Sequence, residues 1–273
     1  MTDLPTPPPP VEPGRTASSP APLVLGAVAL VVSLVALALA VVGAADGVSD
    51  APGSTTTDAS SSADTDADLF RGPDDLPAVI DEVRRSVVDV ACGDGGGTGF
   101  AMDIEVEDPS GPYTTVIVTN HHVIDECLDD AAPLVIVVGD ELVEATNARI
   151  RNTDSDIDLA LIEIDLEVAA IKVADTFAEP GWWSMVIGNP YDPDFEEILY
   201  NFVSIGHIGY VLDETWNYTT ATINKGNSGG PLVNARGELI GITTYASAST
   251  EEGVWNIAVD SAALCETLID CSD

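Results

Sequence analysis

About twelve short apolar or alternating runs lie between residues 87 and 259, and they restrict the fold more than any other feature of this chain. Glycine, aspartate and asparagine separate the runs, and few stretches between them have helical spacing. Many short strands with little helix are typical of an all-β barrel or sandwich. The runs are Val87–Cys92, Gly99–Ile104, Tyr113–Thr119, Leu134–Val138, Glu144–Arg151, Leu159–Ile164, Ser184–Ile187, Ile198–Ile208, Tyr218–Thr222, Pro231–Val233, Leu239–Tyr245 and Val254–Val259.

A connecting stretch at 165–181 divides these runs into two sets of six. Apolar residues at helical spacing predict a short helix over 75–86, before the first run. A second short helix is expected over Asp260–Ile269, after the last run. We therefore expect one folded, mostly β region over residues 75–273.

The first 45 residues have two parts of opposite character. Residues 1–22 are rich in Pro and Ser and predict a disordered tail, because they offer almost nothing to bury. Residues 23–45 carry no charge and are long enough to cross a bilayer as a single transmembrane helix. A cleaved signal peptide is the alternative, since Gly43-Ala44-Ala45 resembles a cleavage site, but the apolar run is longer than such peptides need.

The basic residues around this span predict its orientation. Arg15 is the only one before it, and the next is Arg71, beyond a run of aspartates. The positive-inside rule then predicts a cytoplasmic tail, one span of the cell membrane and an extracytoplasmic body. Residues 46–74, rich in Asp, Ser and Thr, are expected to form a flexible acidic linker.

The chain is strongly acidic, with 46 Asp and Glu against nine Lys and Arg and a formal net charge of −37. Nucleic acid is excluded as a partner, because its phosphates would be repelled rather than neutralised. Solubility is the simplest reason for the acidity. A habitat of high salt, where the repulsion is screened, is a second hypothesis.

The stretch GNSGGP at 226–231 has the composition that nucleophilic catalysis requires. Small residues on both sides leave the Ser228 hydroxyl clear, and a sharp turn there can present backbone N–H groups to an oxyanion. The same letters also suit a plain connector between two strands. A base and an orienting acid elsewhere in the chain would decide between the two.

Histidines occur only at 121, 122 and 207, and the first two directly follow an apolar run. Neighbouring side chains on an extended chain point to opposite faces, and no further ligands lie nearby, so we expect no metal site. An imidazole at a strand end is better suited to act as a general base.

Asp158 is the best candidate for the orienting acid, because it directly precedes the apolar run LALIEI. An acid at the start of a buried strand can hold an imidazole in one tautomer. Asp154 and Asp156 have the character of ordinary loop acids. The candidates therefore occur in the order His, Asp, Ser, which is the chain order of the chymotrypsin-type triad.

Several motifs in this order resemble the HtrA/DegP branch of the trypsin-like serine proteases. They are TNHHVI, DIDLALIEI, VIGNP, INKGNSGGPLVN and GELIGI, and together they span roughly residues 78–260. The resemblance implies two six-stranded antiparallel β-barrels with the active site between them. It also implies cleavage of polypeptide substrates through an acyl-enzyme, with no cofactor.

Matched motif by motif, the resemblance implies a role for each candidate. His122 would be the base, Asp158 the orienting acid and Ser228 the nucleophile. The oxyanion hole would be formed by the backbone N–H groups of Gly226 and Ser228, with Asn227 between them.

Three departures from the wider family pattern narrow the expectation. Asn227 stands where many digestive relatives have Asp, so activation through an ion pair with a newly cut N-terminus is not expected. Thr222, which with Thr243 and Thr244 is expected at the specificity pocket, carries no charge. Cleavage after small or aliphatic residues is therefore favoured over cleavage after Lys or Arg. The chain as given ends at Asp273, so we expect no PDZ domain of the kind that many HtrA proteins carry.

Four cysteines in an exported domain suggest disulfides, and their spacing does not suggest zinc. Three pairings are possible. Chymotrypsin-like proteases often join the segment after the catalytic His to an earlier strand, so the resemblance favours Cys92–Cys127, which leaves Cys265–Cys271.

Two rival functions stay open at this point. One is a protease fold that has no catalysis and only binds peptides, against which the complete triad argues. The other is a latent protease whose oxyanion loop is reordered by a partner or peptide. The oligomeric state cannot be read from the sequence.

Overall fold

A computed structural model of the protein describes residues 66–139, 142–249 and 253–269. The predicted tail at 1–22, the predicted transmembrane helix at 23–45 and linker residues 46–65 lie outside the described residues. Within the part that is described, no helix is both long and apolar enough to cross a membrane.

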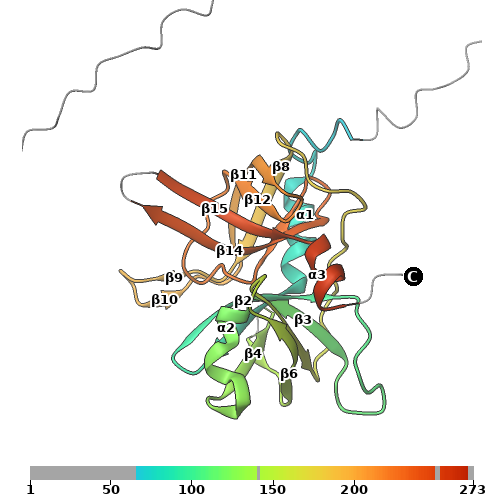
Figure 1. The fold of residues 1–273 in the computed structure, drawn as a ribbon, viewed down its shortest axis with the longest axis vertical. Coiled ribbons are helices and arrows are strands. Elements are labelled where there is room, and N and C mark those ends of the chain that lie inside the picture. The colour runs from blue at the N-terminus through green and yellow to red at the C-terminus, as the bar shows by residue number, and fades with distance from the viewer. Residues whose placement is uncertain (1–65, 140–141, 250–252, 270–273) are drawn as a thin grey trace, which may run out of the picture. The chain divides into compact units, whose positions relative to one another are not determined.

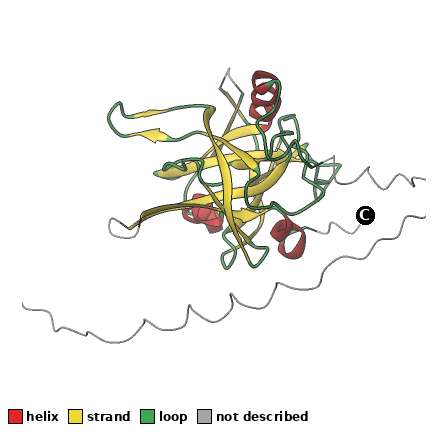
Figure 2. Cartoon of the chain, turned by 90° about the horizontal axis from the view of Figure 1, so that it is seen from above, coloured by secondary structure: helices red, strands yellow, loops and turns green. Residues whose placement is uncertain are grey.

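The described chain forms two large antiparallel sheets and a separate two-stranded hairpin, with three short helices and two 3-10 turns, at Arg84–Ser86 and Asp125–Asp130 (Figures 1 and 2). The first sheet has seven strands in the order β5-β4-β1-β2-β3-β7-β6, and the second is a closed barrel in the order β11-β12-β15-β14-β13-β8. The elements are α1 Leu76–Val83, β1 Val87–Cys92, β2 Gly95–Met102, β3 Thr115–Thr119, α2 His121–Ile124, β4 Leu134–Val138, β5 Val143–Glu144, β6 Ala148–Asp154, β7 Leu159–Ile164, β8 Trp183–Gly188, β9 Tyr191–Asp192, β10 Glu197–Ile198, β11 Phe202–Leu212, β12 Trp216–Thr219, β13 Pro231–Val233, β14 Leu239–Ser249, β15 Gly253–Asp260 and α3 Ala262–Thr267.

The mostly β fold is confirmed, and the second set of strands forms the expected six-stranded barrel. The expectation of a six-stranded barrel is wrong for the first set. There the chain turns after β4 and adds β5 as an extra edge strand, through the pairs Val137–Glu144 and Val138–Val143. Among the described residues no ladder joins β5 to β6, so this sheet has two free edges.

The predicted strand Ile198–Ile208 is divided in the structure. Ile198 belongs to the short hairpin β9–β10, which Figure 1 shows projecting from the barrel, and β11 begins only at Phe202. Asn201 has φ 57°, a left-handed backbone conformation that interrupts extended structure. The sequence did not predict the hairpin, because residues 192–197 are mostly acidic and acidic residues are depleted in strands.

Each sheet has its own apolar core. In the first, Val88 and Val90 of β1 pack with Ile117, Ile136 and Ile162. The second core lies inside the barrel and extends to the outer side of the first sheet. The predicted disulfide Cys92–Cys127 is confirmed, whereas Cys271 of the predicted pair Cys265–Cys271 lies outside the described residues, so this pair stays a prediction.

Residues 66–74, expected to be the end of a flexible linker, are instead packed onto the folded region. Leu69 is buried, and its carbonyl accepts a hydrogen bond from the N–H of Trp183 at 2.7 Å. Asp68 accepts a hydrogen bond from the guanidinium of Arg236, also at 2.7 Å. The burial of Leu69 and the Asp68–Arg236 ion pair thus anchor a segment whose composition predicts a tether.

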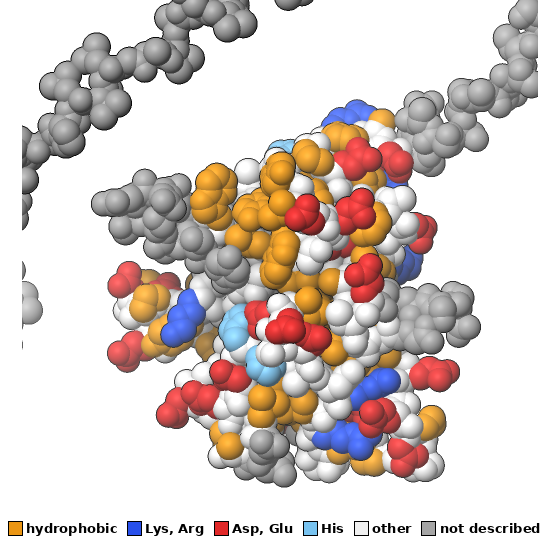
Figure 3. Space-filling view, in the orientation of Figure 1, with side chains coloured by type: hydrophobic (Ala, Val, Ile, Leu, Met, Phe, Trp, Pro, Cys, Tyr) orange, Lys and Arg blue, Asp and Glu red, His pale blue; other side chains and the backbone are white. Residues whose placement is uncertain are grey.

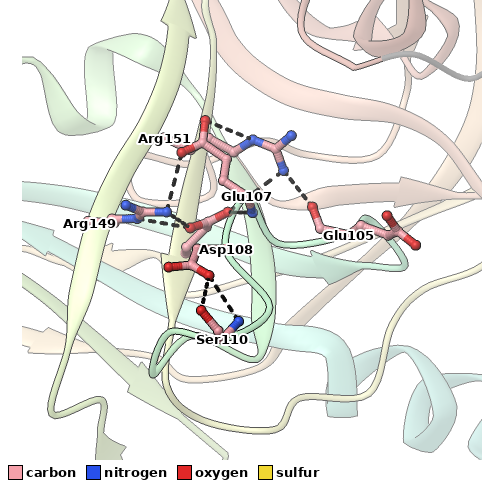
Figure 4. A network of polar contacts seen from close by, with 7 residues as sticks. Glu105, Glu107, Asp108, Ser110, Arg149 and Arg151 are labelled. Atoms are coloured by element: carbon pink, nitrogen blue, oxygen red, sulfur yellow. Dashed lines mark hydrogen bonds and ion pairs between the residues drawn. The ribbon is translucent and has the colours of Figure 1, made fainter.

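A polar network fixes the loop between β2 and β3 on the first sheet (Figure 4). Its centre is Glu163, a fully buried carboxylate on β7. Glu163 accepts hydrogen bonds from the guanidinium of Arg149 at 2.6 and 2.9 Å and from the N–H of Glu107 at 2.7 Å. Arg151 donates to the carbonyl of Glu105 at 2.7 Å. The buried charge is thus paired and hydrogen-bonded, as stability requires.

Candidate active site

The first sheet supplies the predicted base. Strand β3 ends at Thr119, and the chain turns at once into the four-residue helix α2. Val123 and Ile124 of this helix are buried in the first core, which fixes the helix in place. The side chain of His122 remains 46% exposed. Histidine side chains lie near the middle of the face shown in Figure 3, where the two sheets meet.

Asp158 holds His122 in a defined orientation through two contacts. One carboxylate oxygen accepts the backbone N–H of His122 at 2.9 Å, and the other lies 2.7 Å from its ring Nδ1. With the proton on Nδ1, that nitrogen donates to Asp158 and Nε2 is left free to accept a proton. The Asp158 carbonyl in turn accepts a hydrogen bond from the side chain of Asn120 at 2.7 Å.

The backbone at Asp158 is left-handed, with φ 58°. Such a conformation is uncommon outside glycine, although Asp and Asn adopt it more readily than other residues. Strand β7 follows directly and is buried at every position, so the chain on one side of the acid is rigid. The conformation of this residue directs its carboxylate toward α2 instead of along the strand.

The environment of Asp158 favours the ionised carboxylate. Burial alone would raise its pKa, but hydrogen bonds from the His122 ring, from Thr244 and from the His122 N–H outweigh that effect. The pKa of Asp158 is therefore lower than its ordinary value. An ionised carboxylate at this place stabilises the imidazolium that forms when His122 takes a proton.

Ser228 lies in a turn whose glycines are required by space as well as by conformation. Gly226 and Gly229 have φ of 99° and 82°. A Cβ atom at Gly229 would lie 2.2 Å from both the Thr119 hydroxyl and the Thr98 carbonyl, which leaves no room for a side chain. The turn is thus pressed against the first sheet at this position.

Thr98 of β2 fastens this turn to the first sheet. Its N–H donates to the Ser228 carbonyl at 2.8 Å, and its hydroxyl donates to the Gly226 carbonyl at 2.7 Å. Neither the Gly226 N–H nor the Ser228 N–H donates a hydrogen bond to any described residue. These two N–H groups are therefore available for an oxyanion.

Thr244 of β14 connects the acid with the predicted nucleophile. Its hydroxyl donates to Asp158 at 2.6 Å, and its carbonyl accepts the Ser228 hydroxyl at 2.7 Å. Among the described residues no hydrogen bond joins Ser228 to His122. The three predicted catalytic residues are therefore brought together by way of Thr244.

The residues predicted for a specificity pocket have different surroundings. Thr222 is exposed, and its N–H donates to the Ser204 hydroxyl at 2.7 Å. Thr243 is buried, and its hydroxyl donates to the carbonyls of Asn227 and Gly230. The hydroxyls of Thr243 and Thr244 thus hold the serine turn and the acid, and the place of these residues in a specificity pocket stays a prediction.

The amide of Asn227 does not face the reacting groups. The residue is fully buried, and its side-chain oxygen would lie 2.8 Å from a Cβ atom added at Gly188. Its contribution to the turn is through the backbone, with the N–H donating to Asn224 at 3.0 Å. An uncharged residue suits this buried place better than an unpaired carboxylate would.

The other histidines are not part of this cluster. His121 contacts the Thr153 hydroxyl through Nδ1 at 2.7 Å, and His207 lies on β11. No group of three or more His, Cys, Asp or Glu in the described part of the chain could hold a metal ion. Sequence reasoning missed Thr98, and it assigned Thr244 to a specificity pocket without its contact to Asp158, because a threonine in an apolar strand gives no sign of which groups its hydroxyl will contact.

Comparison with known proteins finds serine proteases that resemble this chain. Residues 97–242 match the family described as trypsin-like peptidase domain. The chain is 33% identical over 177 residues to the putative serine protease HhoA of Synechocystis sp., covering 62% of this chain and 41% of that protein. It is 38% identical over 134 residues to the periplasmic serine endoprotease DegP of Salmonella typhimurium, covering 47% of this chain and 27% of that protein.

A solved structure gives the same picture of the fold. The serine endoprotease from Yersinia pestis superposes with a TM-score of 0.57 at 26% identity, covering 72% of this chain and 66% of that one. The chain spans less than half the length of the two curated relatives named above.

Proposed function

This chain belongs to the family of trypsin-like peptidase domains, and we propose that it is a membrane-anchored, extracytoplasmic serine endopeptidase with Ser228 as its nucleophile. His122 is the general base in this proposal, and Asp158 orients it. The backbone N–H groups of Gly226 and Ser228 form the oxyanion hole. The anchor of the proposal is residues 23–45.

One observation carries the proposal. Thr244 touches both the carboxylate of Asp158 and the hydroxyl of Ser228, while the same carboxylate holds His122 by two hydrogen bonds. A connector turn without catalytic function would have no need for an acid that fixes a half-exposed imidazole beside it. The two free N–H groups of the turn complete the requirements for acyl transfer.

In the proposed reaction the Ser228 hydroxyl leaves the Thr244 carbonyl by rotation about the Cα–Cβ bond and turns toward Nε2 of His122. The hydroxyl proton passes to Nε2 as Oγ attacks the carbonyl carbon of the substrate. The oxyanion that develops is stabilised by the two N–H groups of the turn. His122 then returns the proton to the leaving amine, and water hydrolyses the ester that remains. Hydrogen bonds of this kind often form only in the substrate complex, which is consistent with the Ser228 contact seen here.

The substrate class and the location are parts of the same proposal. Thr222 lies six residues before Ser228 and carries no charge, which favours small or aliphatic residues on the acyl side of the cleaved bond. The relative DegP is periplasmic by name, and the disulfide Cys92–Cys127 suits an oxidising compartment. Both points support a body outside the cytoplasm.

The test uses the full-length protein and a fluorophosphonate probe, which transfers its phosphonyl group to an activated serine with loss of fluoride. We expect labelling of the parent, none of Ser228→Ala, and at least a hundredfold slower labelling of His122→Ala. His121→Ala is the matched control, because that histidine lies next to the base but contacts only Thr153, and it should label at the parent's rate.

Equal labelling of the parent and the Ser228→Ala protein would refute Ser228 as the nucleophile. A parent that is folded and never labels would refute the active enzyme and favour the peptide-binding module or the latent protease. Peptide cleavage by the labelled protein, followed by mass spectrometry of the products, reports the residue on the acyl side.

A further inference from the structure

The turn that carries Ser228, residues 226–230, is called the oxyanion turn below. A cavity of about 360 Å³ lies beside this turn and includes Gly226 in its lining. Asp89 of β1 and Asn189 line it on one side, and Tyr191 and Ile198 of the β9–β10 hairpin line it on another. The Lys225 carbonyl accepts the Tyr191 N–H at 3.0 Å, so the hairpin begins directly against the oxyanion turn. The volume is at the lower end of the range of ligand pockets and suits one side chain.

The position of the cavity relates it to one part of a peptide substrate. Its lining includes Gly226 but neither Thr244 nor Thr222, the residue assigned above to the acyl side of the cleaved bond. A side chain held in this cavity therefore belongs to the portion of the substrate that leaves first, beyond the cleaved bond.

Asp89 is the unusual residue of this cavity. Side chains alternate along a strand, and since Val88 and Val90 pack into the first core, Asp89 points to the opposite face. Its exposed fraction is 7%. No described residue forms a hydrogen bond or an ion pair with its carboxylate. The Asn227 amide is fully buried without a partner, whereas the Asp89 oxygens are not among the fully buried atoms. The opening that they face is the cavity.

The charge at Asp89 lacks a counterion among the described residues. Burial raises its pKa to about 6. The charge of Asp89 also contributes, after burial, to raising the pKa of Tyr200. Lys225 lines the same cavity, yet no carboxylate of a described residue lies within salt-bridge distance of it. A buried carboxylate that no described residue neutralises is a ready partner for a cation from outside.

The remaining walls fit an apolar stem that ends in such a cation. Tyr191 and Ile198 offer apolar surface, and Gly95–Gly97 present backbone without side chains. Lysine and arginine combine a hydrocarbon stem with a charged end. Arginine offers the better geometry, because its planar fork matches a carboxylate. The net charge of −37 attracts basic peptides toward the whole molecule.

We propose that this cavity binds a lysine or arginine side chain at one of the first two substrate residues after the cleaved bond, with Asp89 as its ion-pair partner. The inference rests on the proposed peptidase function and deepens it by naming the substrate class. Asp89 is a specificity residue in this scheme, and it takes no part in the transfer of protons.

The experiment measures kcat/KM of the full-length protein for quenched fluorescent peptides that share one aliphatic acyl side. Arginine, citrulline or glutamate is placed at the first or second position after the cleaved bond. Citrulline keeps the shape of arginine without its charge. At one of the two positions we expect a preference for arginine over citrulline of about 10-fold to 100-fold, the range that a buried charged hydrogen bond provides.

The variant Asp89→Asn should lower this preference to about one, because Asn keeps the shape of the side chain and removes its charge. Asp94→Asn is the matched control, because Asp94 lines the same cavity but is exposed, and it should keep the preference of the parent. A parent preference near one at both positions would overturn the inference. So would a preference that survives Asp89→Asn or disappears in Asp94→Asn.

Failure of the inference differs from failure of the proposed function. If the citrulline peptide is cleaved and the probe labels Ser228 without any preference for arginine, only the subsite is wrong. If no peptide is cleaved and no label is found, the peptidase itself is wrong and the subsite falls with it. A melting temperature of Asp89→Asn no lower than that of the parent confirms that the variant is folded.

Discussion

Replacing Asp89 by Asn should make the free protein more stable at neutral pH. The carboxylate is nearly buried and has no partner among the described residues, so its ionised form destabilises the folded state. Its pKa rises from the ordinary value of 3.8 to about 6. A difference of this size corresponds to about 3 kcal/mol at a pH well above both values. The Asn amide also loses contact with water, so we expect a gain of about 1–3 kcal/mol.

The pH dependence of this gain follows from the direction of the shift. Because the folded protein binds the Asp89 proton more tightly than the unfolded chain, the parent loses stability as the pH rises from about 4 to about 6. The variant lacks this loss, so the difference between the two proteins is largest above pH 6 and shrinks below it. Asp260, whose pKa is also raised by burial, is present in both proteins and cancels in the difference.

Urea unfolding of the parent and Asp89→Asn at pH 7.5 and pH 5 measures both free energies of unfolding. Asp94→Asn should change the free energy by less than about 0.5 kcal/mol at either pH, as exposed substitutions usually do. An Asp89→Asn protein that is less stable than the parent at pH 7.5 would show that the carboxylate has a favourable partner. A gain that is equal at both pH values would show that charge is not its cause.

Three further outcomes follow from the contacts around the site. Thr244→Val removes the hydroxyl that donates a hydrogen bond to Asp158, so it should lower kcat/KM about tenfold and change the pH profile of kcat/KM. Thr244→Ser keeps a hydroxyl and should restore both. Gly229→Ala places a Cβ 2.2 Å from backbone and side-chain atoms at φ 82°, so its probe labelling should be lost and its melting temperature lowered. Removing the disulfide with Cys92→Ala and Cys127→Ala opens a loop of 35 residues and should lower the free energy of unfolding by about 3–4 kcal/mol, measured by urea unfolding.

Much of the fold could be predicted because turn residues delimit the strands clearly. Strands β1, β4, β7 and β13 have the predicted bounds, and each is a continuous apolar or nearly apolar run. The errors lie where composition and packing disagree. Leu69 lies in an acidic stretch, yet its burial, together with the Asp68–Arg236 ion pair, fixes that stretch on the folded region. The β9–β10 hairpin is acidic and carries no strand pattern.

The triad candidates could be predicted for a local reason, since each stands at the end of a strand or in a glycine-rich turn. The groups that connect these candidates could not be predicted from the sequence. Thr98 and Thr244 act through hydroxyl contacts with residues more than eighty positions away. The burial of Asp89 could not be predicted either, because an acid that alternates with valines in a strand predicts a solvent-facing side chain. That face is covered instead by a segment of the second half of the chain.

The register of one pair of strands determines both flanks of the candidate site. Asp89 on β1 is the partner of Thr98 on β2. Thr98 holds the oxyanion turn through Gly226 and Ser228, and Asp89 supplies the charge of the cavity next to that turn. A slip of one residue between β1 and β2 would reverse the faces of every side chain on one of them and separate these two functions. In the proposed enzyme, catalytic geometry and the selection of a basic residue after the cleaved bond are therefore set by the same hydrogen-bond ladder.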